Sequence, residues 1–355
     1  MNNNEKQLNE VERNNRNILK NNKPLVYEKI MKYQEKVEKG ESIAIIQFQY
    51  DYTCNFKCEH CSILGFQGKK NSRCFTIEDV KELSRQADEM GLANVAITGG
   101  EPLVFKDLDQ LVEAINPQKF YIAMDTNGWF LDEEKAKHLK TIGIDKIQLS
   151  LDSLEAKEHD SFRHKVGAHE KALRGVDAAL AAGLNVIVST VVTKSRIHSE
   201  EFIDFLEYFK SKNVGVFVTY AKPVGAWAGH FDELVDKEDM KYMNELEKKY
   251  NVFTHLTPSY GMDLGCIAVK RMISITKYGD VMPCPYMHTS LGNFFEESLQ
   301  EIVNRGMKIK YFGEKVNTCL MAEDREFIHN YVEKKLYQDN LPVPWKEVFE
   351  EGDLI

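Results

Sequence analysis

The chain has 355 residues, 43% of them hydrophobic and 10% aromatic, a composition typical of a globular protein large enough for two domains. Its formal net charge of −9 disfavours a nucleic-acid partner, because proteins that bind phosphate backbones usually carry a basic face. No stretch approaches the ~20 apolar residues that span a bilayer, and residues 1–23 lack the apolar region of a signal peptide. We therefore expect a cytoplasmic protein without a membrane partner.

The segment before Ile43 has the sparse apolar positions of a surface helix, and we expect residues 1–41 to form an N-terminal helical extension. Such a helix either packs against the domain that follows or serves as a partner-binding element.

From Ile43 onward, short β-branched or aromatic runs alternate with amphipathic helical patterns. The expected strands are Ile43–Tyr50, Asn94–Thr98, Phe120–Asp125, Lys146–Leu151, Asn185–Thr193 and Gly215–Tyr220. The expected helices are Thr76–Met90, Leu108–Ile115, Asp132–Thr141, Glu170–Ala182 and Ser199–Lys212. This alternation predicts an α/β fold with a parallel sheet and right-handed crossovers.

Three cysteines directly follow the first strand, with the spacing Cys-x3-Cys-x2-Cys: Cys54, Cys58 and Cys61. Three thiolates are one ligand short of what a four-iron cluster or a tetrahedral zinc ion normally takes. A site that lacks one ligand is open for chemistry, so this loop indicates an enzyme.

Polar and glycine-rich segments end the next three strands, at the edge where parallel α/β folds gather their reactive groups. They are Gly99-Gly100-Glu101-Pro102, Thr126-Asn127-Gly128 and Ser150-Leu151-Asp152-Ser153.

The pattern changes near residue 226, where we place a domain boundary. Lys277-Tyr278-Gly279-Asp280 lies between two apolar runs and predicts a hairpin turn. Cys266, Cys284 and Cys319 lie in this second half, which we assign to residues 226–320, followed by a helical tail at 321–355.

The cysteine spacing and the ordered strand ends together resemble the radical S-adenosylmethionine (radical SAM) enzymes. The resemblance covers roughly residues 42–225 and implies a partial (β/α)6 TIM-like barrel. It also implies a [4Fe–4S] cluster held by Cys54, Cys58 and Cys61, whose fourth iron binds S-adenosylmethionine, and a reductant such as flavodoxin or ferredoxin.

By the same resemblance, Gly99, Gly100 and Glu101 meet the methionine ammonium of S-adenosylmethionine. Ser150, Asp152 and Asn127 are candidates for its ribose and carboxylate, although serine and aspartate at strand ends are also ordinary helix caps. Arg163 either pairs with a carboxylate of cofactor or substrate or is a surface arginine.

The spacing of Cys266, Gly279 and Cys284 resembles the opening of the C-terminal domains called SPASM and twitch, which hold auxiliary iron–sulfur clusters. A full SPASM domain would carry several further cysteines, and Cys319 is the last in the chain. We therefore expect a smaller, twitch-like α+β domain with at most one auxiliary cluster, held by Cys266, Cys284 and Cys319.

Several alternatives stay open at this point. The first cysteines could form a zinc knuckle with His60, and any single cysteine elsewhere could be a small core residue. Within the radical SAM interpretation we expect net oxidation of a small-molecule or peptide substrate, with the auxiliary cluster accepting an electron. A redox-neutral epimerase, mutase or lyase is the alternative, with Cys74 or Cys319 returning a hydrogen atom. A non-catalytic iron–sulfur electron carrier or scaffold is the third.

Overall fold

The computed structural model describes residues 17–66 and 72–355. Each of the six predicted strands is found within two residues of its expected ends. They are β1 (Ile45–Asp51), β2 (Asn94–Gly99), β3 (Tyr121–Thr126), β4 (Lys146–Ser150), β5 (Asn185–Val192) and β6 (Gly215–Tyr220). The helices that cover them are α4 (Ile77–Glu89), α5 (Leu108–Ile115), α6 (Glu133–Ile142), α7 (Ala156–Phe162), α8 (Ala168–Ala181) and α9 (Glu200–Ser211).

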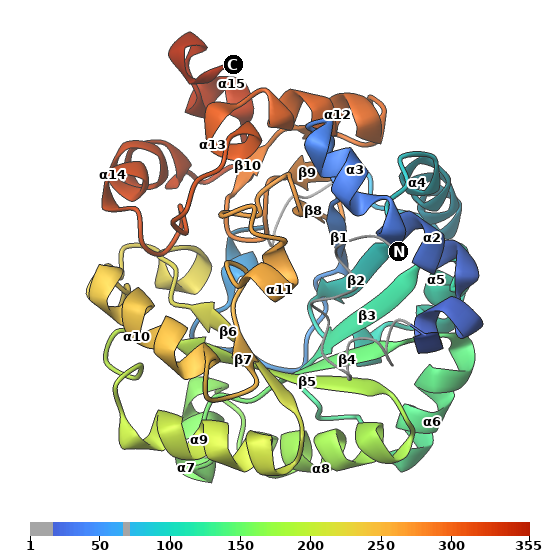
Figure 1. Ribbon diagram of the computed structural model, residues 1–355, viewed down its shortest axis with the longest axis vertical. Helices are drawn as coiled ribbons and strands as arrows, with labels where there is room; N and C mark the ends of the chain where they lie inside the picture. The colour runs from blue at the N-terminus through green and yellow to red at the C-terminus, as the bar shows by residue number, and fades with distance from the viewer. Residues whose placement is uncertain (1–16, 67–71) are drawn as a thin grey trace.

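The strands surround a central lumen and the helices lie outside it, as Figure 1 shows in a view down the barrel. All six strands pair in parallel and in chain order, and β7 (Val252–Phe253) extends the series in parallel beside β6. The expected partial, TIM-like α/β barrel is confirmed. Helix α7 was not predicted, because its seven residues carry too few apolar positions for a periodic pattern.

The second half of the chain continues the same sheet. Strand β8 (Met272–Ile275) pairs in parallel with the free side of β1, and β9 (Asp280–Met282) and β11 (Gly292–Asn293) follow antiparallel. The predicted hairpin joins β8 to β9, and Gly279 takes the positive φ of 87° that its turn requires. The domain boundary near residue 226 stays a prediction.

The second half of the chain contains further short helices and strands. They are α10 (Lys237–Glu247), α11 (Pro258–Gly261), β10 (Thr289–Ser290), α12 (Leu299–Met307), α13 (Lys310–Gly313), α14 (Arg325–Phe327), a π-helix (Ile328–Leu336), β12 (Val343–Pro344) and α15 (Trp345–Val348). Side chains of the C-terminal tail, including Phe327, Val332 and Phe349, are buried in the main core.

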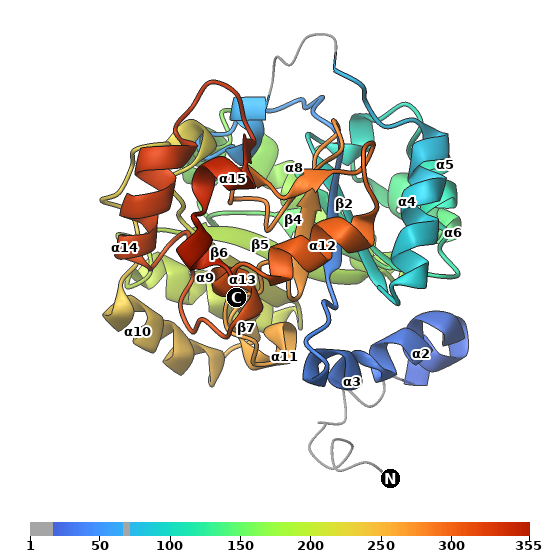
Figure 2. The ribbon, with the colours of Figure 1, turned by 90° about the horizontal axis from the view of Figure 1, so that it is seen from above.

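Helices α2 (Pro24–Met31) and α3 (Tyr33–Glu38) lie across the amino-terminal ends of the barrel strands, below the barrel in Figure 2. Lys23, just before α2, donates to the backbone oxygen of Phe120 and to Asp145, which precede β3 and β4. Val26 and Tyr33 are buried in a small cluster there. This agrees with the expectation of a packed helix. No helix in the described part of the chain is both long and apolar enough to cross a membrane.

Candidate active site

The first three cysteines lie on the loop between β1 and a short 3-10 helix (Ser62–Phe66). Two backbone hydrogen bonds tie this loop to distant segments: Glu59 N donates to Phe162 O at 3.0 Å, and Ala226 N donates to Cys61 O at 3.0 Å. Cys54 is exposed, whereas Cys58 and Cys61 are partly buried. Burial raises the pKa of the Cys54 thiol to about 11, so metal binding there must displace a proton.

The two glycines after β2 allow a close approach of two backbone segments. A Cβ atom on Gly99 would lie 2.2 Å from Asp51 O, and one on Gly100 would lie 2.0 Å from Thr53 O. Gly100 N and Glu101 N also donate to these same two oxygens. The missing side chains therefore first make room for the cysteine loop. The sequence predicted that these glycines make room for a ligand, and both do line the central cavity. Close packing against the cysteine loop is a second reason for glycine at these positions.

Glu101 is buried and its carboxylate is held by three donors. Thr126 Oγ1 donates at 2.6 Å, Asn127 N at 2.8 Å and Leu103 N at 3.1 Å. Burial raises the pKa of Glu101 to about 7, although these hydrogen bonds oppose the shift. The carboxylate thus joins the end of β2 to the end of β3.

Asn127 contacts the cysteine loop directly. Its Nδ2 donates to Asn55 Oδ1 at 2.8 Å, and its Oδ1 accepts from Trp129 N. Asn127 and Ser150 both line the cavity, and Ser150 lies at the end of β4. The side chain of Asn127, directly after β3, thus helps to position the cysteine loop.

Asp152 is directed toward Arg163 rather than into the cavity. Arg163 Nε donates to Asp152 Oδ2 at 2.6 Å, and Val191 N donates to Asp152 Oδ1 at 3.1 Å. Burial alone would raise the pKa of Asp152, but Arg163 outweighs burial and holds it well below its usual value. Asp152 is not among the residues that line the cavity, and its direct contact with the cofactor stays a prediction.

Arg163 lines the cavity and its Nη1 lies 3.8 Å from Cys58 Sγ. Its side chain is only 9% exposed, so the alternative of a surface arginine is wrong. Asp152 thus fixes a buried guanidinium beside one of the three thiols.

His60 lies between the cysteines but stacks flat on Phe162, with ring centroids 4.6 Å apart and an interplanar angle of 4°. Burial lowers the pKa of His60 to about 3, so the ring is neutral at physiological pH. In the described residues no three His, Cys, Asp or Glu side chains are arranged around a single metal ion. A four-iron cluster does not require that arrangement, because each of its thiolates binds a different iron.

The three later cysteines form a second group around a lysine. Cys266 and Cys319 are buried, Cys284 is partly buried, and burial raises the pKa of the Cys284 and Cys319 thiols to about 12 and about 11. Lys222 follows β6; burial lowers its pKa, and the three thiols oppose that shift. Its Nζ donates to Tyr220 O and lies 4.3 Å from the ring centroid of Tyr286.

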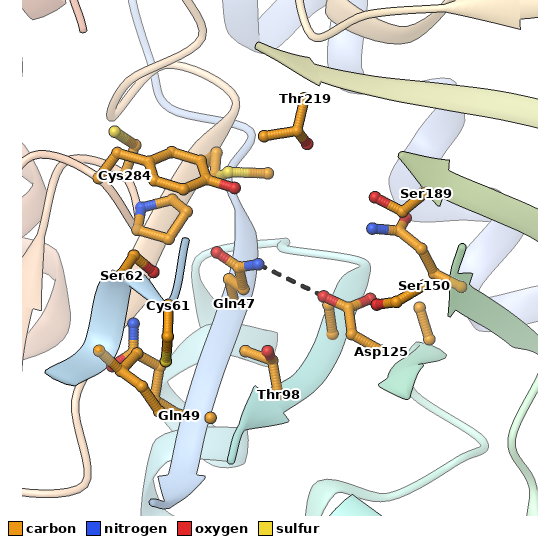
Figure 3. Close-up of a pocket in the computed structure, with 18 of the residues that line it drawn as sticks. Gln47, Gln49, Cys61, Ser62, Thr98, Asp125, Ser150, Ser189, Thr219 and Cys284 are labelled. Carbon is orange, nitrogen blue, oxygen red and sulfur yellow. Dashed lines mark hydrogen bonds between the residues drawn. The ribbon is translucent and has the colours of Figure 1, made fainter. Parts of the chain in front are cut away.

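One cavity of about 970 Å³ connects both groups. Figure 3 shows Cys61 and Cys284 on one side of it, with Asp125, Ser150 and Ser189 across from them. All six cysteines of the two groups line this cavity. Cys74 does not line this cavity; its thiol is exposed and lies 3.7 Å from Ser72 O, and a role as hydrogen-atom donor stays a prediction.

Several residues of this cavity were not predicted from the sequence. They are Gln47, Asp125, Lys146, Gln148, Lys222 and His255. The first four are polar residues at alternate positions of predicted strands, and polar residues on the inner side of a barrel were the signal available. Lys222 and His255 carried no such signal.

The residues present fit iron–sulfur clusters. Each group offers three thiols, the donor that holds such clusters, and each has a basic side chain nearby, Arg163 in the first and Lys222 in the second. Both groups open onto a shared space large enough for additional ligands.

Family comparisons agree with this geometry. A model of the radical SAM superfamily matches residues 51–209, and a model of an iron–sulfur cluster-binding domain called SPASM matches residues 266–324.

Among similar curated proteins is a GTP 3′,8-cyclase of Nautilia profundicola, 29% identical over 290 residues, with 77% of this chain and 87% of that protein covered. Another is an AdoMet-dependent heme synthase of Nitratidesulfovibrio vulgaris, 24% identical over 301 residues, with 76% and 80% covered.

Solved structures share the fold. SuiB of Streptococcus suis, bound to its precursor peptide SuiA, aligns with a TM-score of 0.60 at 20% identity, over 78% of this chain and 69% of that chain. The protein anSMEcpe with bound AdoMet aligns with a TM-score of 0.55 at 18% identity, over 73% and 79%. The chain therefore belongs to the radical SAM superfamily, as an enzyme that uses a [4Fe–4S] cluster and S-adenosylmethionine and carries a C-terminal SPASM domain for auxiliary iron–sulfur binding.

Proposed function

We propose that this enzyme abstracts a hydrogen atom from a substrate held in the central cavity and completes a net two-electron oxidation with the help of its auxiliary cluster. Cys54, Cys58 and Cys61 hold the cluster that binds S-adenosylmethionine. Cys266, Cys284 and Cys319 hold the auxiliary cluster. When bound, the first cluster and S-adenosylmethionine supply a 5′-deoxyadenosyl radical, and the chain positions the reactants.

The observation that carries this proposal is the shared cavity of about 970 Å³, which both groups of cysteines line. A substrate in this space contacts the cofactor side and the auxiliary side at once. An electron acceptor that close to the substrate favours oxidation over isomerisation.

The neighbouring residues orient the cofactor. Glu101, locked by Thr126 and Asn127, keeps the glycine turn against the cysteine loop. Ser150 presents a hydroxyl to the same space, and Arg163 places positive charge beside Cys58. In this proposal Glu101 acts on the methionine ammonium and Ser150 on the ribose.

Electrostatics around the auxiliary thiols also support oxidation. Burial lowers the pKa of the Lys222 amine, and the negative charge of Cys319, Cys284 and Cys266 in a bound cluster opposes that shift and favours the protonated form. Positive charge in a low-dielectric site favours the more negative, reduced form of a cluster. The first cluster in turn requires an external electron, for which we propose a flavodoxin- or ferredoxin-type carrier.

A redox-neutral reaction is the second candidate, and one observation favours it. Similar curated proteins at 29% identity are named GTP 3′,8-cyclase, a name that denotes ring formation. In that case Cys319, which is 4% exposed and lines the cavity, is the thiol placed to return a hydrogen atom. We do not retain the non-catalytic carrier, because the chain belongs to a superfamily of enzymes.

The test is the iron and sulfide content, with Mössbauer spectra, of anaerobically reconstituted wild type. We expect about eight irons per chain, falling to about four in the Cys54/Cys58/Cys61 triple alanine variant and in the Cys266/Cys284 double alanine variant. Only the triple variant should stop formation of 5′-deoxyadenosine. Persistent 5′-deoxyadenosine in the triple variant contradicts the assignment, and an unchanged iron content in the double variant removes the auxiliary cluster.

A solvent-exchange experiment separates the two reaction classes. Substrate recovered from turnover in D2O gains deuterium at carbon if a thiol returns the hydrogen atom. An oxidised product without deuterium incorporation supports the first proposal.

A further inference from the structure

The inner surface of the barrel carries polar side chains on several of its strands. In closed (β/α)8 barrels, bulky branched side chains from the strands fill the interior. Here the inward positions that line the cavity include Gln47 on β1, Asp125 on β3, Lys146 and Gln148 on β4, and Ser189 on β5. The lumen is therefore arranged to receive a polar molecule.

The Asp125 carboxylate and Gln47 Oε1 receive few hydrogen bonds in the described part of the chain. Gln47 Nε2 is the only donor to the Asp125 carboxylate in the described part of the chain, at a long 3.5 Å (Figure 3). Gln47 Oε1 is buried and accepts no hydrogen bond there. Buried acceptors are almost always satisfied in folded proteins, so the unpartnered Gln47 Oε1 beside a carboxylate with a single long hydrogen bond indicates a ligand that donates.

The strand register leaves space beside this pair. Gln47 pairs with Ala96, Ala96 with Ala123, and Ala123 with Lys146. At this level of the barrel, two alanines therefore separate the long polar side chains of Gln47 and Lys146. Asp125 lies one level higher, beside Gln148. The small alanines leave room for a ligand group.

Lys146 favours the charged form of Asp125 but donates no hydrogen bond to it. The two interact electrostatically, and no hydrogen bond joins them. Burial raises the pKa of Asp125 to about 6, and Lys146 opposes that shift, so the group is a carboxylate at neutral pH. A charged acceptor strengthens a hydrogen bond from a nitrogen donor.

Figure 3 places Asp125 across the cavity from Cys61 and Cys284, with Thr98, Ser150 and Ser189 around it. A group bound at Asp125 therefore lies opposite both cysteine groups.

We propose that Asp125 and Gln47 form the substrate-anchoring subsite, which binds a hydrogen-bond-donating nitrogen of the substrate, an amine or an amide N–H. This inference rests on the proposed function, since it identifies the same cavity as the substrate site. A substrate that presents only carboxylate or phosphate oxygens to Asp125 does not fit this subsite.

The test uses three probes with one carbon skeleton: butylamine, butanamide and butyrate. Their binding to the reconstituted holoenzyme with S-adenosylmethionine is measured by ligand-observed NMR. We expect butylamine and butanamide to bind, and butyrate to bind at least about tenfold more weakly. Asp125→Asn should weaken butylamine by a similar factor, and Gln47→Leu should weaken both nitrogen probes. The control Asp177→Asn, at a carboxylate with a 63% exposed side chain, should leave binding unchanged.

Equal binding of butyrate and butylamine overturns the subsite, as does unchanged binding in both cavity variants or no binding to wild type. If Asp125→Asn does not fold, Gln47→Leu alone decides. Formation of 5′-deoxyadenosine by wild type without substrate is assayed in parallel. Its absence contradicts the proposed function, whereas its presence with unselective probe binding contradicts only the subsite.

Discussion

The buried pair between Asp152 and Arg163 offers the sharpest test of how the site is held together. Its two side chains are 8% and 9% exposed, and their atoms approach to 2.6 Å. Replacement of Asp152 by Asn leaves the Arg163 charge buried without its counter-charge. Removing one partner of a buried pair lowers the free energy of unfolding by about 3–5 kcal/mol. Because Asn retains one acceptor oxygen, we expect a loss near about 3 kcal/mol.

The chain contains a matched control. Arg174 and Glu170 form another arginine–carboxylate pair, but both side chains are 67% exposed on α8. Such i,i+4 surface pairs contribute about 0.3–0.5 kcal/mol, so Glu170→Gln should be nearly neutral. Urea unfolding of the two variants and wild type, under reductant, measures the difference.

Two outcomes would refute the reasoning. Equal loss of stability in both variants would mean that burial does not govern the pair. A stable Asp152→Asn variant with wild-type iron content would mean that Asp152 does not hold Arg163 beside Cys58.

Three further predictions concern the same site. Gly100→Ala should reduce iron loading of the first cluster, because its Cβ would lie 2.0 Å from a backbone oxygen. The control Gly91→Ala, with open space around it, should not reduce iron loading. Iron analysis of both variants decides. Burial raises the folded-state pKa of Glu101 from 4.5 to about 7, so its stabilisation is complete at low pH and lost as pH rises through that interval. Between pH 4.5 and about 7, wild type should lose about 3 kcal/mol of unfolding free energy relative to Glu101→Gln. Urea titrations at several pH values measure this difference, and a constant difference would contradict the prediction. Lys222→Met should make the reduction potential of the auxiliary cluster more negative, since a nearby cation is removed; an unchanged potential in EPR-monitored titrations would show that the lysine does not act on the cluster.

Much of the barrel was predictable because its signals are local. Strands β2 to β6 and helices α4 to α9, except α7, follow from periodicity, and Gly143 ends α6 with a φ of 107° as a helix-capping glycine should. The cysteine loop and the Gly-Gly-Glu turn were recognisable for the same reason: each is a short continuous motif.

The remaining features depend on contacts between distant segments. Nothing near Asp152 in the sequence shows that Arg163 takes its carboxylate, and nothing near Gly100 shows that Thr53 O occupies the space of its missing Cβ. The orientation of Asp125 into the lumen required knowledge that the sheet closes around it. Lys222 joins the auxiliary cysteines only because β6 ends beside them.

The pairing of β8 with β1 has a consequence for how the protein is made. Strand β1 is central in the finished sheet, yet its two neighbours come from opposite halves of the chain. Until residues 272–275 leave the ribosome, one side of β1 has unpaired backbone groups, the kind of edge that promotes aggregation. Contacts so distant in sequence also form late in folding. A truncated chain that ends near residue 225 should therefore be prone to aggregation, and coexpression of residues 226–355 should restore solubility by supplying the missing strand.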